Sequence, residues 1–284
     1  MIRQISVLGT GTMGRGIAYL SAVAGYDTVL FDVDPQALGA AHAAIGSLLR
    51  KGVEKQKISE DAAEEAIARV QLVPDLEPAV NGADLIVEAV PESLDLKVDL
   101  FAQADLFCPA ETIFASNTSS ISITKLASNV ERREQFVGMH FFNPPHAMKL
   151  IEIVRGERTS DATIEKVSEV AAKMGKTAII VRDTPGFATS RLGVAIGLEA
   201  IRMLEEGVAS AEDIDRAMEL GYNHPMGPLR LTDLVGLDVR LGIAEYLAAN
   251  LGERFEPPQL LRQLVSEGKL GRKTGEGFYR WPAE

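Results

Sequence analysis

The chain starts with a short apolar run, residues 5–8, and Gly9-Thr10-Gly11-Thr12-Met13-Gly14 follows it at once. A run of this kind predicts a buried strand, and the glycine spacing is typical of a tight turn from a strand into a helix. The first glycine permits the turn, the second leaves the backbone open to close approach, and the third lets the helix pack against the strand. A chain that begins with a strand, a glycine turn and a helix is expected to be built of β-α units.

Short β-rich runs alternate with longer alanine-rich stretches through the first part of the chain. We predict strands at residues 5–8, 28–31, 85–87, 112–115, 136–139, 151–154 and 178–181. Helices are predicted at residues 17–24, 35–49, 60–69 and 94–106. The alternation predicts an α/β fold, a Rossmann-type doubly wound sheet that is mostly parallel.

The pattern changes after Asp183-Thr184-Pro185-Gly186, and only helical stretches follow. These stretches are residues 187–206, 211–220, 227–236, 238–250 and 257–267. We therefore predict an N-terminal domain at 1–182 and an all-α C-terminal domain at 183–284. The apolar residues of the second domain are many for a bundle of its size, which favours a homodimer formed through it.

Composition excludes several classes of protein. The chain has 284 residues and a net charge of −11, whereas a general binder of nucleic acid or anionic membranes is expected to be basic. No apolar run approaches the roughly 18 residues of a membrane span, and the first residues read as a strand, not a signal peptide. Cys108 is the single cysteine, which favours a reducing cytoplasm. No histidines have metal-ligand spacing with a nearby acid, so we expect no metal.

The glycine motif also predicts a dinucleotide site. Gly9, Gly11, Thr12, Met13 and Gly14 would place the backbone and the helix N-terminus against a pyrophosphate. Asp32 closes the second predicted strand, where its carboxylate can accept hydrogen bonds from a ribose and would repel a 2′-phosphate. The cofactor expected is therefore NAD and not NADP. A purely structural glycine turn, with Asp32 as a solvated strand end, is the alternative.

A second candidate site lies around Gly138-Met139-His140-Phe141-Phe142-Asn143-Pro144-Pro145. His140 ends an apolar run just before a turn that the prolines enforce, and Glu152 begins the next apolar run. Such a turn can bring an imidazole and a carboxylate together, and a histidine held in this way can transfer protons near neutral pH. The alternatives are a histidine satisfied at a sheet edge and a glutamate on the strand surface.

Several separated motifs, in order, resemble the L-3-hydroxyacyl-CoA dehydrogenase family, and most of all its free-standing bacterial 3-hydroxybutyryl-CoA dehydrogenases. Besides the glycine motif and His140-Phe141-Phe142-Asn143-Pro144, they are Ser116-Asn117-Thr118-Ser119-Ser120, Asp183-Thr184-Pro185-Gly186-Phe187, Pro225-Met226-Gly227-Pro228 and Gly271-Arg272-Lys273-Thr274-Gly275-Glu276-Gly277-Phe278-Tyr279. The resemblance covers nearly the whole chain. It implies NAD-linked interconversion of a 3-hydroxyacyl-CoA and a 3-ketoacyl-CoA, and a dimer formed through the second domain.

The resemblance also implies roles for individual residues. His140 would be the general base or acid, Glu152 would hold its imidazole, and Ser119 would bind the substrate oxygen and the cofactor. Further residues implied at the cofactor are Glu92, Lys97, Asn117, Asn143 and Lys273. The alternatives are a turn or helix cap for the serines, a turn former for Asn143, a solvated helix N-terminal acid for Glu92, and a mobile surface lysine for Lys273.

Arg50, Lys51, Lys55 and Lys57 form the one dense basic cluster of this acidic chain. Coenzyme A carries three phosphate groups, and a local positive patch would attract them. We expect Lys51 and Lys55 to bind the substrate; the alternative is a solvated helix end.

One position departs from the family pattern. Ser190 stands where the family has an asparagine before the arginine, in Phe187-Ala188-Thr189-Ser190-Arg191. Serine is shorter and lacks the amide's donors, so Ser190 is a weak catalytic candidate.

Two rival functions stay open. One is a CoA-independent 3-hydroxyacid or sugar-acid dehydrogenase, which would use the same serine, histidine and glutamate. The other is a non-catalytic NAD-binding protein with a structural or regulatory role, which would bind NADH without turnover.

Overall fold

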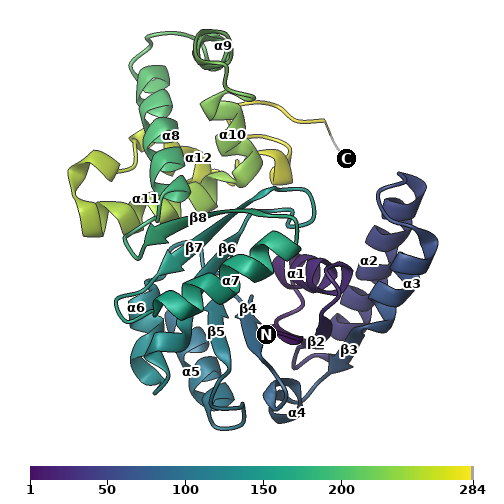
Figure 1. Cartoon of the computed structure of the whole chain (residues 1–284). Helices are drawn as coiled ribbons and strands as arrows, with labels where there is room; N and C mark the ends of the chain where they lie inside the picture. The colour runs from purple at the N-terminus through teal and green to yellow at the C-terminus, as the bar shows by residue number, and fades with distance from the viewer. Residues whose placement is uncertain (283–284) are drawn as a thin grey trace. The chain divides into compact units, whose positions relative to one another are not determined.

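The computed structural model describes residues 1–282, which fall into two compact units, Met1–Asp183 and the residues from Thr184 onward. The first unit is an eight-stranded sheet flanked by helices (Figure 1). Its strands are β1 (Gln4–Leu8), β2 (Asp27–Phe31), β3 (Val70–Val73), β4 (Leu85–Glu88), β5 (Ile113–Ser116), β6 (Phe136–Phe141), β7 (Leu150–Arg155) and β8 (Thr177–Arg182). The sequence predicted all of them except β3, a four-residue strand at the sheet edge with two exposed residues.

The strand order is β3-β2-β1-β4-β5-β6-β7-β8. All neighbouring pairs are parallel except β6 and β7, which run antiparallel. The predicted Rossmann-type, mostly parallel sheet is therefore confirmed. In such a sheet the strand order reverses between β1 and β4, and ligands bind outside the carboxyl ends of the strands at that point.

The helices of this unit are α1 (Thr12–Val23), α2 (Pro35–Glu54), α3 (Glu60–Ala68), α4 (Leu76–Val80), α5 (Leu94–Asp105), α6 (Ile123–Leu126) and α7 (Asp161–Lys173). Single turns of 3₁₀ helix follow at Ala127–Asn129 and Arg133–Gln135. Helix α1 begins at Thr12, five residues before the predicted start. Helices α4, α6 and α7 were not predicted, although the Ser160 hydroxyl caps α7.

Alternate residues of the strands face opposite sides of the sheet, so each face has its own apolar layer. On one side Val7, Val87 and Val137 pack with Ile17 of α1 and Ile45 of α2 in one buried cluster. On the other side the rings of Phe101, Phe114 and Phe136 are in contact, with centroid distances of 4.7 to 6.1 Å. The central strands are covered on both faces, which gives their carboxyl ends a rigid base.

The second unit is built of helices, as predicted: α8 (Thr189–Glu205), α9 (Ala211–Tyr222), α10 (Pro228–Val235), α11 (Leu237–Leu251) and α12 (Gln259–Ser266). Single 3₁₀ turns occur at Glu253–Phe255 and Arg272–Thr274. None of the helices within residues 1–282 has both the length and the apolar character needed to cross a membrane.

Two buried carboxylates bind the C-terminal segment to the helices of this unit. Asp233 accepts hydrogen bonds from the backbone N–H groups of Phe278 and Tyr279, both at 2.9 Å, and from Trp281 Nε1 at 2.8 Å. Asp215 accepts one from the Tyr279 hydroxyl at 2.7 Å. Burial and the neighbouring Asp215 carboxylate together raise the pKa of Tyr279.

Candidate active site

The glycine turn has the geometry that its spacing predicts. Gly9 has φ +106°, and a Cβ atom there would lie 2.8 Å from the Ala89 carbonyl oxygen. A Cβ at Gly14 would lie 1.9 Å from the Gly9 carbonyl oxygen. No atom lies within 4 Å of the corresponding point at Gly11. The first and third glycines are therefore required by packing, whereas the second leaves open space beside the turn.

That open space belongs to a cavity of about 940 Å³ at the carboxyl ends of β1, β2 and β4. It is lined by residues 9–13, 31–33, 74–76, 89–91 and 96 together with Asp99, Leu100 and Gln103. Glycine backbone, an acid and an apolar floor are the groups that bind a dinucleotide at a Rossmann switch point. Gly9, Gly11, Thr12, Met13 and Asp32 all line the cavity, and Gly14 lies behind it.

The Asp32 carboxylate accepts three hydrogen bonds from neighbouring residues. Its Oδ2 accepts hydrogen bonds from the Thr10 backbone N–H at 3.0 Å and the Thr10 hydroxyl at 2.5 Å. Its Oδ1 accepts one from the Asp34 backbone N–H at 3.1 Å. Each carboxylate oxygen has two lone pairs, so Asp32 is held in place and keeps capacity to accept from a ribose hydroxyl.

His140 and Glu152 face each other across the antiparallel pair β6–β7. His140 Nδ1 lies 2.7 Å from Glu152 Oε2. Glu152 is 0% exposed and His140 is 6% exposed, so the pair is shielded from water. A carboxylate this close to Nδ1 places the proton on that nitrogen, because only a protonated nitrogen can donate to it. In this tautomer the lone pair of the other ring nitrogen, Nε2, is the basic site of the imidazole.

The serine-rich loop after β5 is bonded to the strand that carries His140. Asn117 Oδ1 accepts a hydrogen bond from the Phe141 backbone N–H at 2.9 Å. The Ser119 backbone N–H donates to Glu92 Oε1 at 3.0 Å, and the Ser120 hydroxyl donates to the same oxygen at 3.2 Å. The structure thus connects Asn117 and Ser119 with two neighbours from other elements, β6 and the segment after β4.

Lys97, on α5, is buried and does not lie at the surface. It is 1% exposed, and its ammonium contacts Glu88 Oε1 at 2.5 Å, Glu92 Oε2 at 3.2 Å and the Val90 carbonyl oxygen at 3.2 Å. An ammonium has three protons to donate, so these three oxygens account for all of them. A direct contact of Lys97 with a cofactor stays a prediction.

Sequence reasoning missed Glu88 and Ser116. Glu88 is 0% exposed, and its Oε2 accepts a hydrogen bond from the Ser116 hydroxyl at 2.5 Å. Burial raises the pKa of Glu88, against the opposing effect of Lys97. Burial alone would also raise the pKa of Glu92, but Lys97 and the Thr118 hydroxyl outweigh it and lower that pKa. The signal available in the sequence was a glutamate at the end of an apolar run.

The turn after β6 is held by a residue that the sequence did not indicate. Asn143 precedes a cis peptide bond to Pro144, and the chain returns at Leu150 as β7. Lys176 Nζ donates to the carbonyl oxygens of Pro145 at 2.5 Å and Met148 at 2.6 Å. Burial lowers the pKa of Lys176. Asn143 itself is exposed at the start of the turn, as its predicted role at the cofactor requires.

A second cavity, of about 320 Å³, lies where α1 and α2 approach this turn. Lys51, Arg15 and His146 line it, whereas Lys55 caps the C-terminal end of α2 and is exposed. Burial and the charges of Lys176, Lys57, Lys51 and Lys55 lower the pKa of His146. One member of the predicted basic cluster, Lys51, therefore lines this cavity, and the positive charges of Lys51, Lys55 and Lys57 act on His146 in its wall.

Two predicted residues belong to the helical unit. Lys273 Nζ lies 2.6 Å from both carboxylate oxygens of Asp238. Burial alone would raise the pKa of Asp238, but the hydrogen bond from Lys273 outweighs it and lowers that pKa. Ser190 lies in the first turn of α8.

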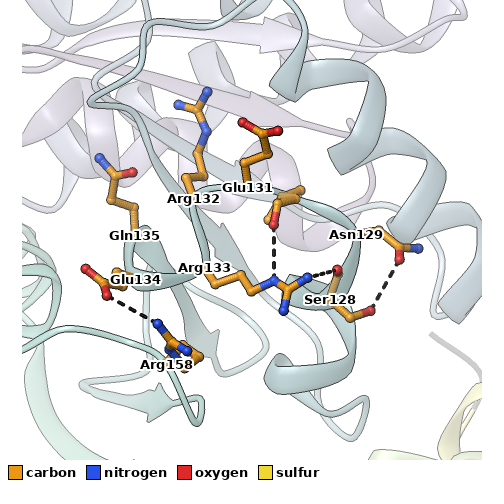
Figure 2. A pocket seen from close by; sticks show the side chains of 9 residues that line it. Ser128, Asn129, Glu131, Arg132, Arg133, Glu134, Gln135 and Arg158 are labelled. Carbon is orange, nitrogen blue, oxygen red and sulfur yellow. Dashed lines mark hydrogen bonds and ion pairs between the residues drawn. The ribbon is translucent and has the colours of Figure 1, made fainter.

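A hollow of about 680 Å³ at the opposite end of β6 carries none of this chemistry (Figure 2). Two of its arginines are bound to neighbouring groups of the hollow. Arg133 donates to the Ser128 carbonyl oxygen at 2.8 Å, and Arg158 pairs with Glu134 at 3.6 Å (Figure 2). Within residues 1–282, no group of three or more histidine, cysteine, aspartate or glutamate side chains is arranged to hold a metal ion.

Comparisons with known proteins identify the family of this chain. The model of the 3-hydroxyacyl-CoA dehydrogenase NAD-binding domain matches residues 4–184, and that of the family's C-terminal domain matches residues 186–281. A probable 3-hydroxybutyryl-CoA dehydrogenase of Bacillus subtilis is 44% identical over 279 residues, which cover 98% of this chain and 97% of the relative. The human mitochondrial hydroxyacyl-coenzyme A dehydrogenase is 40% identical over 288 residues, which cover 99% and 92% of the two chains.

A solved structure has the same fold over its whole length. The crystal structure of (S)-3-hydroxybutyryl-CoA dehydrogenase from Ralstonia eutropha superposes with a TM-score of 0.96 at 41% identity, and the match covers 100% of both chains. With both domain models matched and the dinucleotide cavity in place, the chain belongs to the 3-hydroxyacyl-CoA dehydrogenase family.

Proposed function

We propose that this protein interconverts (S)-3-hydroxyacyl-CoA and 3-ketoacyl-CoA with NAD, and that His140 and Glu152 carry the proton transfer. The buried contact of 2.7 Å between His140 Nδ1 and Glu152 Oε2 is the observation that carries the proposal. Oxidation of a secondary alcohol needs a hydride acceptor and a base for the hydroxyl proton. When bound, the nicotinamide supplies the acceptor, and the chain supplies the base.

His140 accepts the hydroxyl proton at Nε2 during oxidation and returns it during reduction. Glu152 accepts the Nδ1 proton, which fixes the tautomer and stabilises the imidazolium that forms. The Ser119 hydroxyl donates a hydrogen bond to the substrate oxygen and so stabilises its developing charge. Asp32 accepts from the adenosine ribose, and the glycine turn binds the pyrophosphate with its backbone N–H groups.

The proposed CoA substrate rests on charge. Lys51 lines a cavity at the end of α2 and Lys55 caps that helix, in a chain whose net charge is −11. A local positive field of this kind attracts the several charges of the CoA phosphates more strongly than the single carboxylate of a free hydroxyacid or sugar acid. The relatives named above are described as acting on hydroxybutyryl-CoA or hydroxyacyl-CoA, and this supports the same substrate class here.

The proposed homodimer forms through the helical unit. Exposed large apolar side chains of that unit are Leu192, Ile196, Val208, Leu220, Tyr222, Leu231, Leu234, Val235 and Val239. Apolar surface of this extent favours a protein partner. Leu192→Glu, at a side chain that is 64% exposed, should give a monomer in light scattering after size exclusion. Leu106→Glu, on the first unit, should leave the mass unchanged. A monomeric wild type would exclude the dimer.

The function is tested by following NADH oxidation with a series of 3-ketoacyl-CoA chain lengths and with free acetoacetate. Turnover of acetoacetyl-CoA at least a hundredfold more efficient than turnover of acetoacetate is expected. Equal efficiency would favour the CoA-independent dehydrogenase, and NADH binding with no turnover would favour a non-catalytic protein. We also propose that the protein acts in the cytoplasm, which its single, half-buried cysteine, Cys108, supports.

A further inference from the structure

Glu88 has no role in the proton transfer proposed above. It ends β4 with its side chain buried, among apolar neighbours where an acid costs free energy unless it is paired. Both of its oxygens are nevertheless satisfied. Oε1 binds Lys97 Nζ at 2.5 Å and accepts from the Val90 backbone N–H at 2.7 Å, and Oε2 accepts from the Ser116 hydroxyl at 2.5 Å.

One path leads from Glu88 to the serine loop through Lys97. The Lys97 ammonium bridges Glu88 and Glu92, with its Nζ at 2.5 Å and 3.2 Å from the two carboxylates. Glu92 Oε1 in turn accepts from the Thr118 hydroxyl at 2.5 Å and from the Ser119 backbone N–H at 3.0 Å. The chain Glu88–Lys97–Glu92–Ser119 therefore consists of three direct polar contacts.

A second path leads to the same loop through Ser116. Its hydroxyl donates to Glu88 and accepts a hydrogen bond from the Thr118 backbone N–H at 3.2 Å. The Asn117 backbone N–H donates to the Glu88 carbonyl oxygen at 2.9 Å. Glu88 thus fixes the loop from its beginning at Ser116 and from its middle at Ser119, while Lys97 is too buried to exchange its partners for water.

We propose that Glu88 is a positioning residue for this reaction, which orients Ser119 toward the substrate oxygen through Lys97 and Glu92 and through Ser116. The inference rests on the role proposed above for Ser119. It assigns Lys97 a function inside the protein, as the support of Glu92. Networks of this kind hold a reacting group in one geometry, and small displacements of such a group reduce the rate strongly.

The test is a double-mutant cycle between Glu88→Gln and Ser119→Ala, read in kcat and KM for acetoacetyl-CoA. Glu88→Gln should lower kcat by ten- to a hundredfold, with a smaller change in KM. In the Ser119→Ala background the same substitution should lower kcat by less than threefold, because the group that it orients is gone. Asp84→Asn is the matched control, since Asp84 precedes the same strand and accepts from the Arg3 and Gln4 backbone N–H groups; it should leave kcat unchanged.

Two further readouts separate positioning from stability. Lys97→Met leaves Glu88 buried without its cation and should lower the Tm, whereas Glu88→Gln with Lys97→Met removes both charges and should restore most of it. The rate should stay low in the double variant, because the path to Ser119 is still broken. Hydrogen exchange of the protein without cofactor should be faster at Ser119 and Ser120 in Glu88→Gln and unchanged there in Asp84→Asn.

The outcomes distinguish the role proposed for Ser119 from the positioning role proposed for Glu88. A wild-type kcat in Ser119→Ala would remove the proposed role of Ser119, and the positioning role of Glu88 with it. If Ser119→Ala is slow and Glu88→Gln still lowers kcat in that background by as much as it does in the wild type, only the positioning role of Glu88 is overturned. Recovery of kcat together with the Tm in the charge-free double variant would also overturn it and leave a stability role.

Discussion

Glu152 lies directly opposite His140 in the antiparallel pair of β6 and β7, and its carboxylate is 2.7 Å from the imidazole Nδ1. The register fixes this contact, because the two side chains stand on the same face at paired positions of neighbouring strands. Residues 142–149 join β6 to β7, so the His140–Glu152 contact lies in the only antiparallel strand pair of the described sheet.

His140→Gln should lower kcat by roughly 10²- to 10⁴-fold, the usual contribution of a positioned acid or base. The amide cannot take up the hydroxyl proton, whereas the dinucleotide cavity is untouched, so NADH should bind with its original affinity. Stopped-flow turnover and NADH fluorescence titration measure the two quantities. His42→Gln, on α2, is the control and should behave as wild type. A rate within threefold of wild type in His140→Gln would reject this residue as the base.

Glu152→Gln should also lower kcat, by about 10²-fold or more, although the new side chain is the same size. The amide can donate to Nδ1 and so favour the wrong tautomer, and it does not stabilise the imidazolium. Because the substitution leaves shape and packing in place, KM for the acyl-CoA should change less than threefold. An unchanged kcat would show that His140 does not depend on its partner.

Asp32→Ala should raise the KM for NAD by about tenfold, the loss expected for one or two charged hydrogen bonds at roughly 1.5 kcal/mol. Removing the carboxylate also removes the repulsion of a 2′-phosphate, so the ratio of NADP to NAD efficiency should rise. Asp34→Ala is a neighbouring control. Asp34 caps α2 by accepting from the Gln36 backbone N–H at 2.8 Å, so its loss should cost about 1 kcal/mol of stability without changing the cofactor ratio.

Lys51→Ala and Lys55→Ala should each raise the KM for acetoacetyl-CoA several-fold and leave kcat near wild type. Attraction between exposed charges is screened by salt, so the wild-type KM should rise between 50 and about 300 mM NaCl and rise less steeply in either variant. Lys166→Ala, at an exposed position of α7, should keep the wild-type dependence. Parallel salt curves in all three variants would contradict phosphate capture by the basic cluster.

Acid should weaken the protein partly through Glu92. Its pKa is lowered in the folded state from the ordinary value of 4.5, so near pH 4.5 the folded protein binds fewer protons at this site than the unfolded chain does. By linkage the carboxylate contributes stability above that pH, and the contribution is lost as the pH falls through the folded-state pKa. The difference in unfolding free energy between wild type and Glu92→Gln should therefore shrink from pH 7 to pH 4 in urea titrations. If that difference in unfolding free energy grew as the pH fell, the lowered pKa of Glu92 would be contradicted.

Periodicity and turn residues predicted seven of the eight strands and all five helices of the second unit, because these elements carry their own apolar patterns. Helix α1 was placed five residues late because glycine is a poor helix former. Tertiary packing decides that case: a Cβ atom at Gly16 would lie 2.8 Å from the Pro145 side chain, so the glycine is there for close approach.

The site was predictable where partners are joined by a recognisable turn, as His140 and Glu152 are. It was not predictable where partners come from separate strands and a helix. Glu88, Lys97 and Ser116 meet only because β4, α5 and β5 are neighbours in the folded sheet. In the sequence each reads as an isolated polar residue, and Lys97 in particular reads as a surface residue facing a ligand.

Ser190→Asn should change kcat or KM by several-fold, and the change should depend on acyl-chain length. The family pattern has an asparagine at this position, in the first turn of α8, and an amide offers two donors and a longer reach than a hydroxyl. The measurement is NADH oxidation with 3-ketoacyl-CoA substrates of increasing length, with wild type and variant in parallel. Ser168→Asn, on α7 of the first unit, is the control for a serine-to-asparagine substitution elsewhere in the protein. It should leave every rate unchanged. Identical kinetics of Ser190→Asn and wild type at every chain length would show that this position plays no part in the reaction.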